Sequence, residues 1–152
     1  MTNEEVSRML WDMIPKEEVE RAFLSGCDLD GSFAGFVDVY YELSKVIPKH
    51  WTVVDIGCAY NAQSYLFKDH KRYIAVDPSD CEKFKAPNCE IFNMTAKEFL
   101  HTMAFDGLNL DETFAICSYV PNWHNQAPRE LTRLYFKTVF TYYPHGVQET
   151  IL

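Results

Sequence analysis

The chain has 152 residues, 47% of them hydrophobic, and 22 acidic against 14 basic residues give it a net charge of -8. This length fits one domain with one core, and the apolar fraction excludes a disordered chain. No apolar run reaches the roughly 18 residues of a membrane span, and the first residues are acidic rather than basic, so we expect a cytoplasmic protein that is not inserted in a membrane. The negative charge disfavours nucleic acid as a partner.

The first 47 residues show helical periodicity. Apolar residues recur on one face between positions 6 and 13, and a later helix is expected to open at Ser32 and to stop at Pro48. We expect these helices to form an N-terminal cap, residues 1–47, on an α/β core, residues 51–152, within a single domain.

From residue 51 onward, apolar runs alternate with helical patterns. The expected strands are 51–56, 72–77, 89–93, 113–118 and 147–152. The expected helices are 61–70, 95–105 and 127–143, with 79–85 a loop or a poor helix. This alternation predicts a mainly parallel, Rossmann-like sheet of about five strands with helices on both faces, and a ligand site at the carboxyl ends of the strands.

Two acids end neighbouring expected strands. The first strand closes with Asp55 and Gly57, and Asp77 follows 20 residues after Gly57. An acid at the second strand end can accept hydrogen bonds from both ribose hydroxyls, and this spacing fits one strand-helix-strand unit. The pattern therefore indicates a nucleoside site. The structural alternatives are that Asp55 caps the next helix, that Gly57 is a turn glycine and that Asp77 belongs to a solvated turn.

These residues resemble the motifs of class I S-adenosylmethionine-dependent methyltransferases. The resemblance covers about residues 33–152 and matches Asp55-Ile56-Gly57-Cys58-Ala59 to the family's Asp-x-Gly-x-Gly. It implies a sheet of order 3-2-1-4-5 and S-adenosylmethionine as cofactor. The cofactor contacts that it implies are Asp55, Gly57 and Ala59 at the methionine end, Asn61 in the same loop, Asp77 at the ribose, Pro78, Ser79, Asn93 and Met94 near the adenine, and Cys117 at the fourth strand.

A nicotinamide-dinucleotide domain is the competing interpretation of the fold. It would require Gly-x-Gly-x-x-Gly soon after the first strand, and only Gly57 is present. The methyltransferase pattern is also incomplete, because Ala59 and Asn61 stand where its second and third glycines would be. Asn tolerates a positive φ better than other non-glycine residues, so we expect weakened rather than abolished cofactor binding.

The fifth strand is expected to finish at Leu152, so we expect the sixth and seventh strands of the family to be missing. Residues 147–152 would then form an apolar sheet edge, and pairing along it would give a homodimer or a complex with another chain.

The segment after the fourth strand holds the candidate acceptor site. The expected substrate-pocket residues are Ser118, Tyr119, Pro121, Asn122 and Trp123. His124 and Tyr119 are the candidate catalytic residues, because an imidazole or a phenol can remove a proton from an acceptor. An ordinary loop histidine is the equal alternative for His124. The segment lacks Asn-Pro-Pro-Tyr, found in family members that methylate nucleic-acid amines, which further disfavours such a substrate.

The sequence predicts no metal site, because its five histidines are scattered and none forms a His-x-x-x-His pair. Two functional hypotheses remain. The first is methyl transfer to a small-molecule or protein acceptor, and the second is a catalytically inactive module of the same fold that binds the cofactor or a protein partner.

Overall fold

The computed structural model describes residues 17, 39–59, 61–79, 83–102, 107–118 and 128–142. Its strands are β1 (Thr52–Ile56), β2 (Arg72–Val76), β3 (Cys89–Phe92), β4 (Thr113–Ser118) and β5 (Thr138–Tyr142). Its helices are the 3-10 helices η1 (Ala62–Phe67) and η2 (Leu110–Glu112) and the α-helices α4 (Ala96–Leu100) and α5 (Pro128–Tyr135), and residues 39–46 are also helical.

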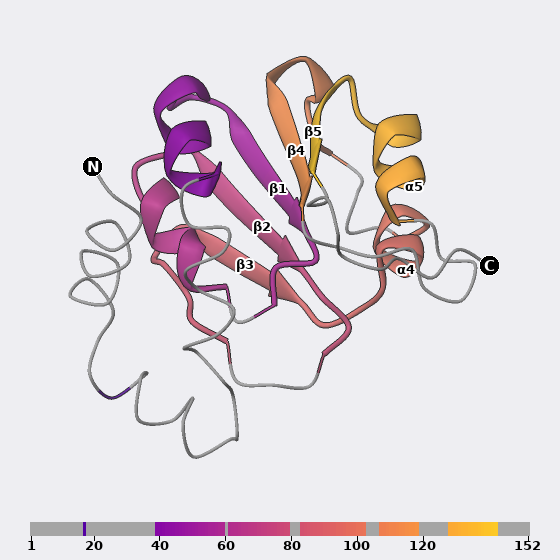
Figure 1. The fold of residues 1–152 in the computed structure, drawn as a ribbon, viewed down its shortest axis with the longest axis horizontal. Coiled ribbons are helices and arrows are strands. Elements are labelled where there is room, and N and C mark those ends of the chain that lie inside the picture. Colours follow the sequence, from indigo (N-terminus) through magenta and orange to yellow (C-terminus); the bar gives the residue numbers. More distant parts are fainter. Residues whose placement is uncertain are drawn as a thin grey trace.

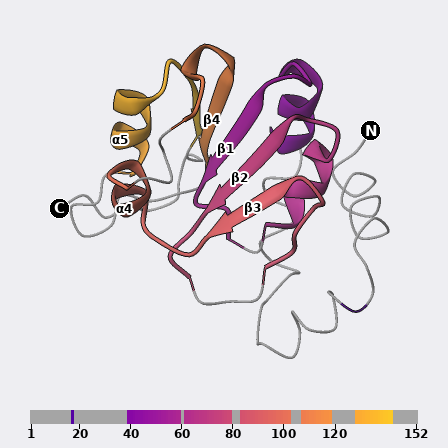
Figure 2. The same ribbon diagram turned by 180° about the vertical axis from the view of Figure 1, so that it is seen from behind.

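The five strands form one parallel sheet in the order β3-β2-β1-β4-β5. The sheet separates two helical layers, with residues 39–46 and η1 on one face and α4 and α5 on the other (Figures 1 and 2). The strand order reverses between β1 and β4, and parallel α/β sheets bind their ligands at such a switch point, beyond the carboxyl ends of the strands. The expected α/β, Rossmann-like fold with order 3-2-1-4-5 is confirmed.

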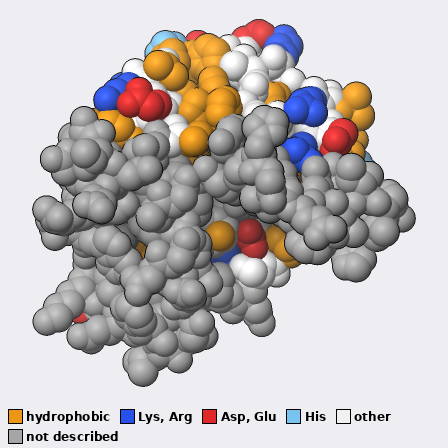
Figure 3. Space-filling view, viewed as in Figure 1, with side chains coloured by type: hydrophobic (Ala, Val, Ile, Leu, Met, Phe, Trp, Pro, Cys, Tyr) orange, Lys and Arg blue, Asp and Glu red, His pale blue; other side chains and the backbone are white. Residues whose placement is uncertain are grey.

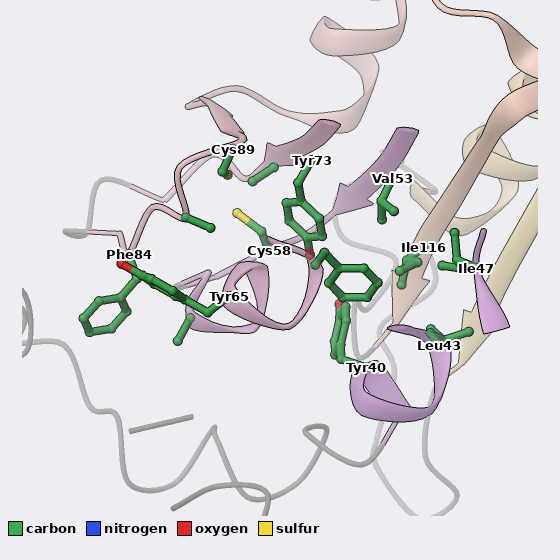
Figure 4. Packing of buried hydrophobic residues seen from close by; sticks show 14 residues of the cluster. Tyr40, Leu43, Ile47, Val53, Cys58, Tyr65, Tyr73, Phe84, Cys89 and Ile116 are labelled. Carbon is green, nitrogen blue, oxygen red and sulfur yellow. The ribbon is translucent and has the colours of Figure 1, made fainter. Parts of the chain in front are cut away.

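Each face of the sheet has its own core, because side chains alternate along a strand. Val53 of β1 packs with Tyr40, Leu43 and Tyr73 under the helix at 39–46, whereas its neighbour Val54 packs against α4 and α5. Figure 4 shows the first of these clusters, with the phenol ends of Tyr40 and Tyr73 directed toward the same place. Both tyrosines are at most 2% exposed, so their hydroxyls need partners inside the protein.

The helix expected over 127–143 is wrong in its C-terminal part, where the structure has a strand. The sequence pattern extended a helix over 127–143, but α5 ends at Tyr135 and β5 occupies Thr138–Tyr142. The apolar spacing continues past the helix end, yet Thr138-Val139-Phe140-Thr141-Tyr142 consists only of β-branched and aromatic residues, which favour a strand. Residues 147–152, and the dimer edge predicted there, lie outside the described residues.

The other helices differ from expectation mainly in length and type. Segment 61–70 forms the short 3-10 helix η1, and α4 is opened by a capping box in which the Thr95 hydroxyl accepts from the Glu98 amide. The helix that includes 39–46 ends before Pro48, as expected, whereas the stripe at 6–13 lies outside the described residues. Within the part of the chain that the structure describes, no helix is long and apolar enough to cross a membrane.

Candidate functional site

The loop after β1 has an unusual backbone. Gly57, Ala59 and Asn61 have φ values of 82°, 50° and 67°, so alternate residues are left-handed. These are the three positions at which the methyltransferase motif would carry glycine. Ala59 and Asn61 are the only non-glycine residues with positive φ in the described part of the chain. The loop thus has a glycine-type conformation at two non-glycine residues.

Asp77 joins this loop to the end of β2. Its Oδ2 accepts a hydrogen bond of 3.0 Å from the Ala59 amide, and its Oδ1 accepts one of 2.8 Å from the Ser79 amide. The side chain is half-buried. The carboxylate therefore organises its own turn, as the turn interpretation expects, and also contacts the loop that follows β1.

Asp55 lies beneath the loop and is completely buried. Its Oδ1 accepts from the Tyr40 hydroxyl at 2.8 Å, and its Oδ2 accepts from the Tyr73 hydroxyl at 2.6 Å and from Gln63 Nε2 at 2.9 Å. Tyr40 in turn accepts from the Ser118 hydroxyl at 3.1 Å. Three of the roughly four lone-pair positions of the carboxylate are therefore used by protein donors.

Burial raises the pKa of Asp55 from 3.8 to about 6, although the hydrogen bonds from Tyr73, Gln63 and Tyr40 oppose the rise. The same environment raises the pKa values of Tyr40 and Tyr73 well above 10, first through burial and then through the negative charge of Asp55. At pH 7 the site therefore contains one buried carboxylate and two neutral phenols that donate to it.

Two buried amides fix the loop from below. Gln63 Nε2 donates to the Cys58 carbonyl at 2.9 Å as well as to Asp55, and Asn61 Nδ2 donates to the Phe84 carbonyl at 2.7 Å. Sequence analysis missed Tyr40, Gln63 and Tyr73 as members of this site. Polar side chains within apolar stripes, such as Tyr40 beside Val37 and Leu43, were the available signal, but nothing in their spacing identifies Asp55 as the shared partner.

The expected adenine-side residues lie at the ends of β2 and β3. Pro78, Ser79 and Asn93 are exposed, and Met94 is half-buried. Lys83 connects the two strand ends, because its Nζ donates to the Ser79 carbonyl at 2.6 Å and to Asn93 Oδ1 at 2.9 Å. A space-filling view shows acidic, basic and hydrophobic side chains together in this region (Figure 3).

Cys117 and Ser118 end β4 on opposite faces of the sheet. Ser118 reaches Tyr40 on the Asp55 face, whereas Cys117 is fully buried among Val54, Ile56 and Phe136 under α4 and α5. Burial raises the pKa of the Cys117 thiol to about 12, so it is an inert core thiol in this structure. The structure thus does not bring Cys117 together with the two acids.

The remaining acceptor-side candidates, Tyr119, Pro121, Asn122, Trp123 and His124, lie outside the described residues. Among the residues that are described, no cluster of three or more His, Cys, Asp or Glu side chains could hold a metal ion.

No protein-family model matches this chain, and no curated protein matches it. Among solved structures it is similar to a "putative type II methyltransferase" from Anaeromyxobacter dehalogenans, with a TM-score of 0.45 and 19% sequence identity. The match covers 65% of this chain and 42% of that one, so this chain spans less than half the length of that protein. The strand order itself defines the class: a Rossmann-like α/β protein.

Proposed function

We propose that this protein binds S-adenosylmethionine at the carboxyl ends of β1 and β2 and transfers its methyl group to a small-molecule or protein acceptor. The observation that carries the proposal is the contact between Asp77 and the Ala59 amide, made in a loop that is left-handed at residues 57, 59 and 61. This contact places an acid and a glycine-type loop together at neighbouring strand ends, beside the switch point of the sheet.

The residues present fit the ribose end of the cofactor. Among the described residues, each Asp77 oxygen accepts one backbone amide and has a second lone-pair position, and the side chain is half-buried. Ribose hydroxyls are donors that such a carboxylate can accept. Asp55 does not fit the direct contact with the methionine ammonium that the resemblance implies, because it is fully buried and already accepts three hydrogen bonds.

Charge favours a sulfonium nucleoside over a dinucleotide. A dinucleotide would place its pyrophosphate at the loop after β1, next to the buried charge of Asp55 and the partly exposed charge of Asp77. Both carboxylates would repel an anion there and attract a cation, and burial weakens the screening of Asp55 by water. S-adenosylmethionine carries the positive charge that this arrangement prefers.

When bound, S-adenosylmethionine supplies an electrophilic methyl group for in-line displacement. The protein's part is alignment and exclusion of water, which provide most of the acceleration in such a transfer. Asp77 would orient the nucleoside, and Ser118 lies at the strand end from which the acceptor segment, with Tyr119, Trp123 and His124, continues. These acceptor-side residues would stack on a flat acceptor and remove its proton where one must be lost.

Calorimetric titration with S-adenosylmethionine, S-adenosylhomocysteine and NAD⁺ tests the proposal. We expect binding of the first two and none of NAD⁺, with Asp77→Asn weakening binding about 10- to 100-fold through loss of charged hydrogen bonds. Asp111→Asn is the charge-matched control, because Asp111 is an exposed acid in η2, before β4, that pairs with Lys137. No binding at millimolar ligand, or equal effects of the two variants, would refute the proposal.

A catalytically inactive cofactor-binding module is the second candidate, and the inaccessibility of Asp55 favours it. Release of S-adenosylhomocysteine separates the two candidates, measured with small amines, phenols and carboxylic acids and with a protein extract as acceptors. Turnover that requires Asp77 supports the enzyme, whereas tight binding without turnover on any of these acceptors supports the module.

A further inference from the structure

Gln63 connects the loop after β1 to the buried acid beneath it. Its Nε2 donates to the Cys58 carbonyl at 2.9 Å and to Asp55 Oδ2 at 2.9 Å, and the residue is only 2% exposed. Cys58 lies between the left-handed residues Gly57 and Ala59. The hydrogen bond from Gln63 therefore acts on the peptide group between Cys58 and Ala59, in the part of the loop where φ is positive.

Asp55 is held in place from three other elements. Tyr73 of β2 and Tyr40 of the helix at 39–46 donate to its two oxygens, and Ser118 of β4 donates to Tyr40. The Asp55 carboxylate therefore has little freedom to turn, and Gln63 is directed by a fixed acceptor. This hydrogen-bond network runs from Ser118, at the end of β4, to the Cys58 carbonyl in the loop after β1.

Building on the proposed cofactor binding, we propose that Asp55 and Gln63 are positioning residues, which hold the Cys58 carbonyl, and with it the loop from Gly57 to Asn61, without touching the nucleoside. Asp55 acts through Gln63 rather than through contact with the ligand's ammonium. The loop amide of Ala59, which donates to Asp77, then lies where nucleoside binding requires it.

Two ligands that differ in the amino-acid group separate positioning from direct contact. S-adenosylhomocysteine carries the ammonium, and 5′-methylthioadenosine lacks the amino-acid portion. Gln63→Met keeps the side-chain length and removes the donor, and Asp55→Asn removes the charge. We expect each variant to bind both ligands about 10-fold more weakly, and the double variant to lose little more than either single variant, because both changes interrupt one pathway.

Asn88→Leu is the matched control for general destabilisation. Asn88, like Gln63, has a side-chain amide that donates two hydrogen bonds, but its acceptors are the backbone carbonyls of Phe67 and His70 at the other end of η1. We expect this variant to be less stable and to retain wild-type affinity for both ligands. Gln63→Met keeps the hydrogen bonds that Tyr40 and Tyr73 donate to Asp55. This variant can therefore test the proposal by itself if Asp55→Asn does not fold.

The outcomes are distinct. Loss confined to S-adenosylhomocysteine in Asp55→Asn would overturn the proposal in favour of an ammonium contact. Unchanged affinity in Gln63→Met, additive losses in the double variant, or an equal loss in Asn88→Leu would overturn it as well. If the unmodified protein binds neither ligand, the proposed function itself fails and the positioning role fails with it.

Discussion

Replacing Ala59 by glycine should stabilise this protein, although removing a methyl group usually does the opposite. Ala59 has a φ of 50°, a left-handed conformation that costs an alanine about 1–2 kcal/mol. Glycine adopts this backbone without strain but loses about 0.4–1 kcal/mol through the greater freedom of the unfolded chain. The net expectation is a gain of about 0.5–1 kcal/mol, and the amide that donates to Asp77 is kept.

Urea unfolding followed by circular dichroism measures this gain, which corresponds to a rise in Tm of roughly 1–4 °C for a chain of this size. The control is Ala96→Gly, in the first turn of α4, which removes the same methyl group from a helical backbone and should cost about 1 kcal/mol. Opposite signs for the two variants are the expected result. A loss at Ala59 equal to that at Ala96 would refute the assignment of strain to the loop.

Three further expectations concern neighbouring features. Asn61→Ala should destabilise the protein by about 2 kcal/mol in urea unfolding, because it removes the buried bond to the Phe84 carbonyl and leaves a left-handed alanine, and an unchanged midpoint would contradict this. The pKa of Asp55 is about 6 in the folded protein, compared with 3.8 for an ordinary Asp side chain. The contribution of Asp55 to the free energy of unfolding is therefore greatest below about pH 4 and falls by about 3 kcal/mol as the pH rises through 6. Asp55→Asn should lack this decline, and parallel stability curves of variant and wild type between pH 4 and 7 would count against it. Thr95→Ala should cost about 1 kcal/mol through loss of the capping box, measured by thermal unfolding. Lys97→Ala, at an exposed position of the same helix, is the control, and a comparable loss in both variants would contradict the prediction.

The sequence predicted the sheet well because its strands are short apolar runs separated by helical patterns. Four strands lie where expected, and the order 3-2-1-4-5 followed from the resemblance. The prediction of helix at β5 was wrong because the apolar spacing continues from α5 into β5. Periodicity alone did not show the change at Phe136, where a tendency toward strand replaces a tendency toward helix.

The site was predictable only in part. The positions of Asp55, Gly57 and Asp77 at strand ends follow from the motif and the spacing. The donors to Asp55 do not, because Tyr40 and Tyr73 lie 15 and 18 residues away along the chain and meet it only through packing. The distinction between a carboxylate that faces a ligand and one that is enclosed by phenols depends on tertiary contacts, which a single sequence does not record.

Tyr40 also bears on how this protein can be divided for experiments. Tyr40 belongs to the segment that sequence analysis assigned to the N-terminal cap, yet its hydroxyl donates a hydrogen bond to Asp55 of β1. A shortened version starting at Trp51 would leave that acid with a vacant acceptor in an apolar interior, at a penalty of about 1–3 kcal/mol. Fragments designed for crystallisation or fusion should therefore retain the helical residues 39–46 that precede Pro48.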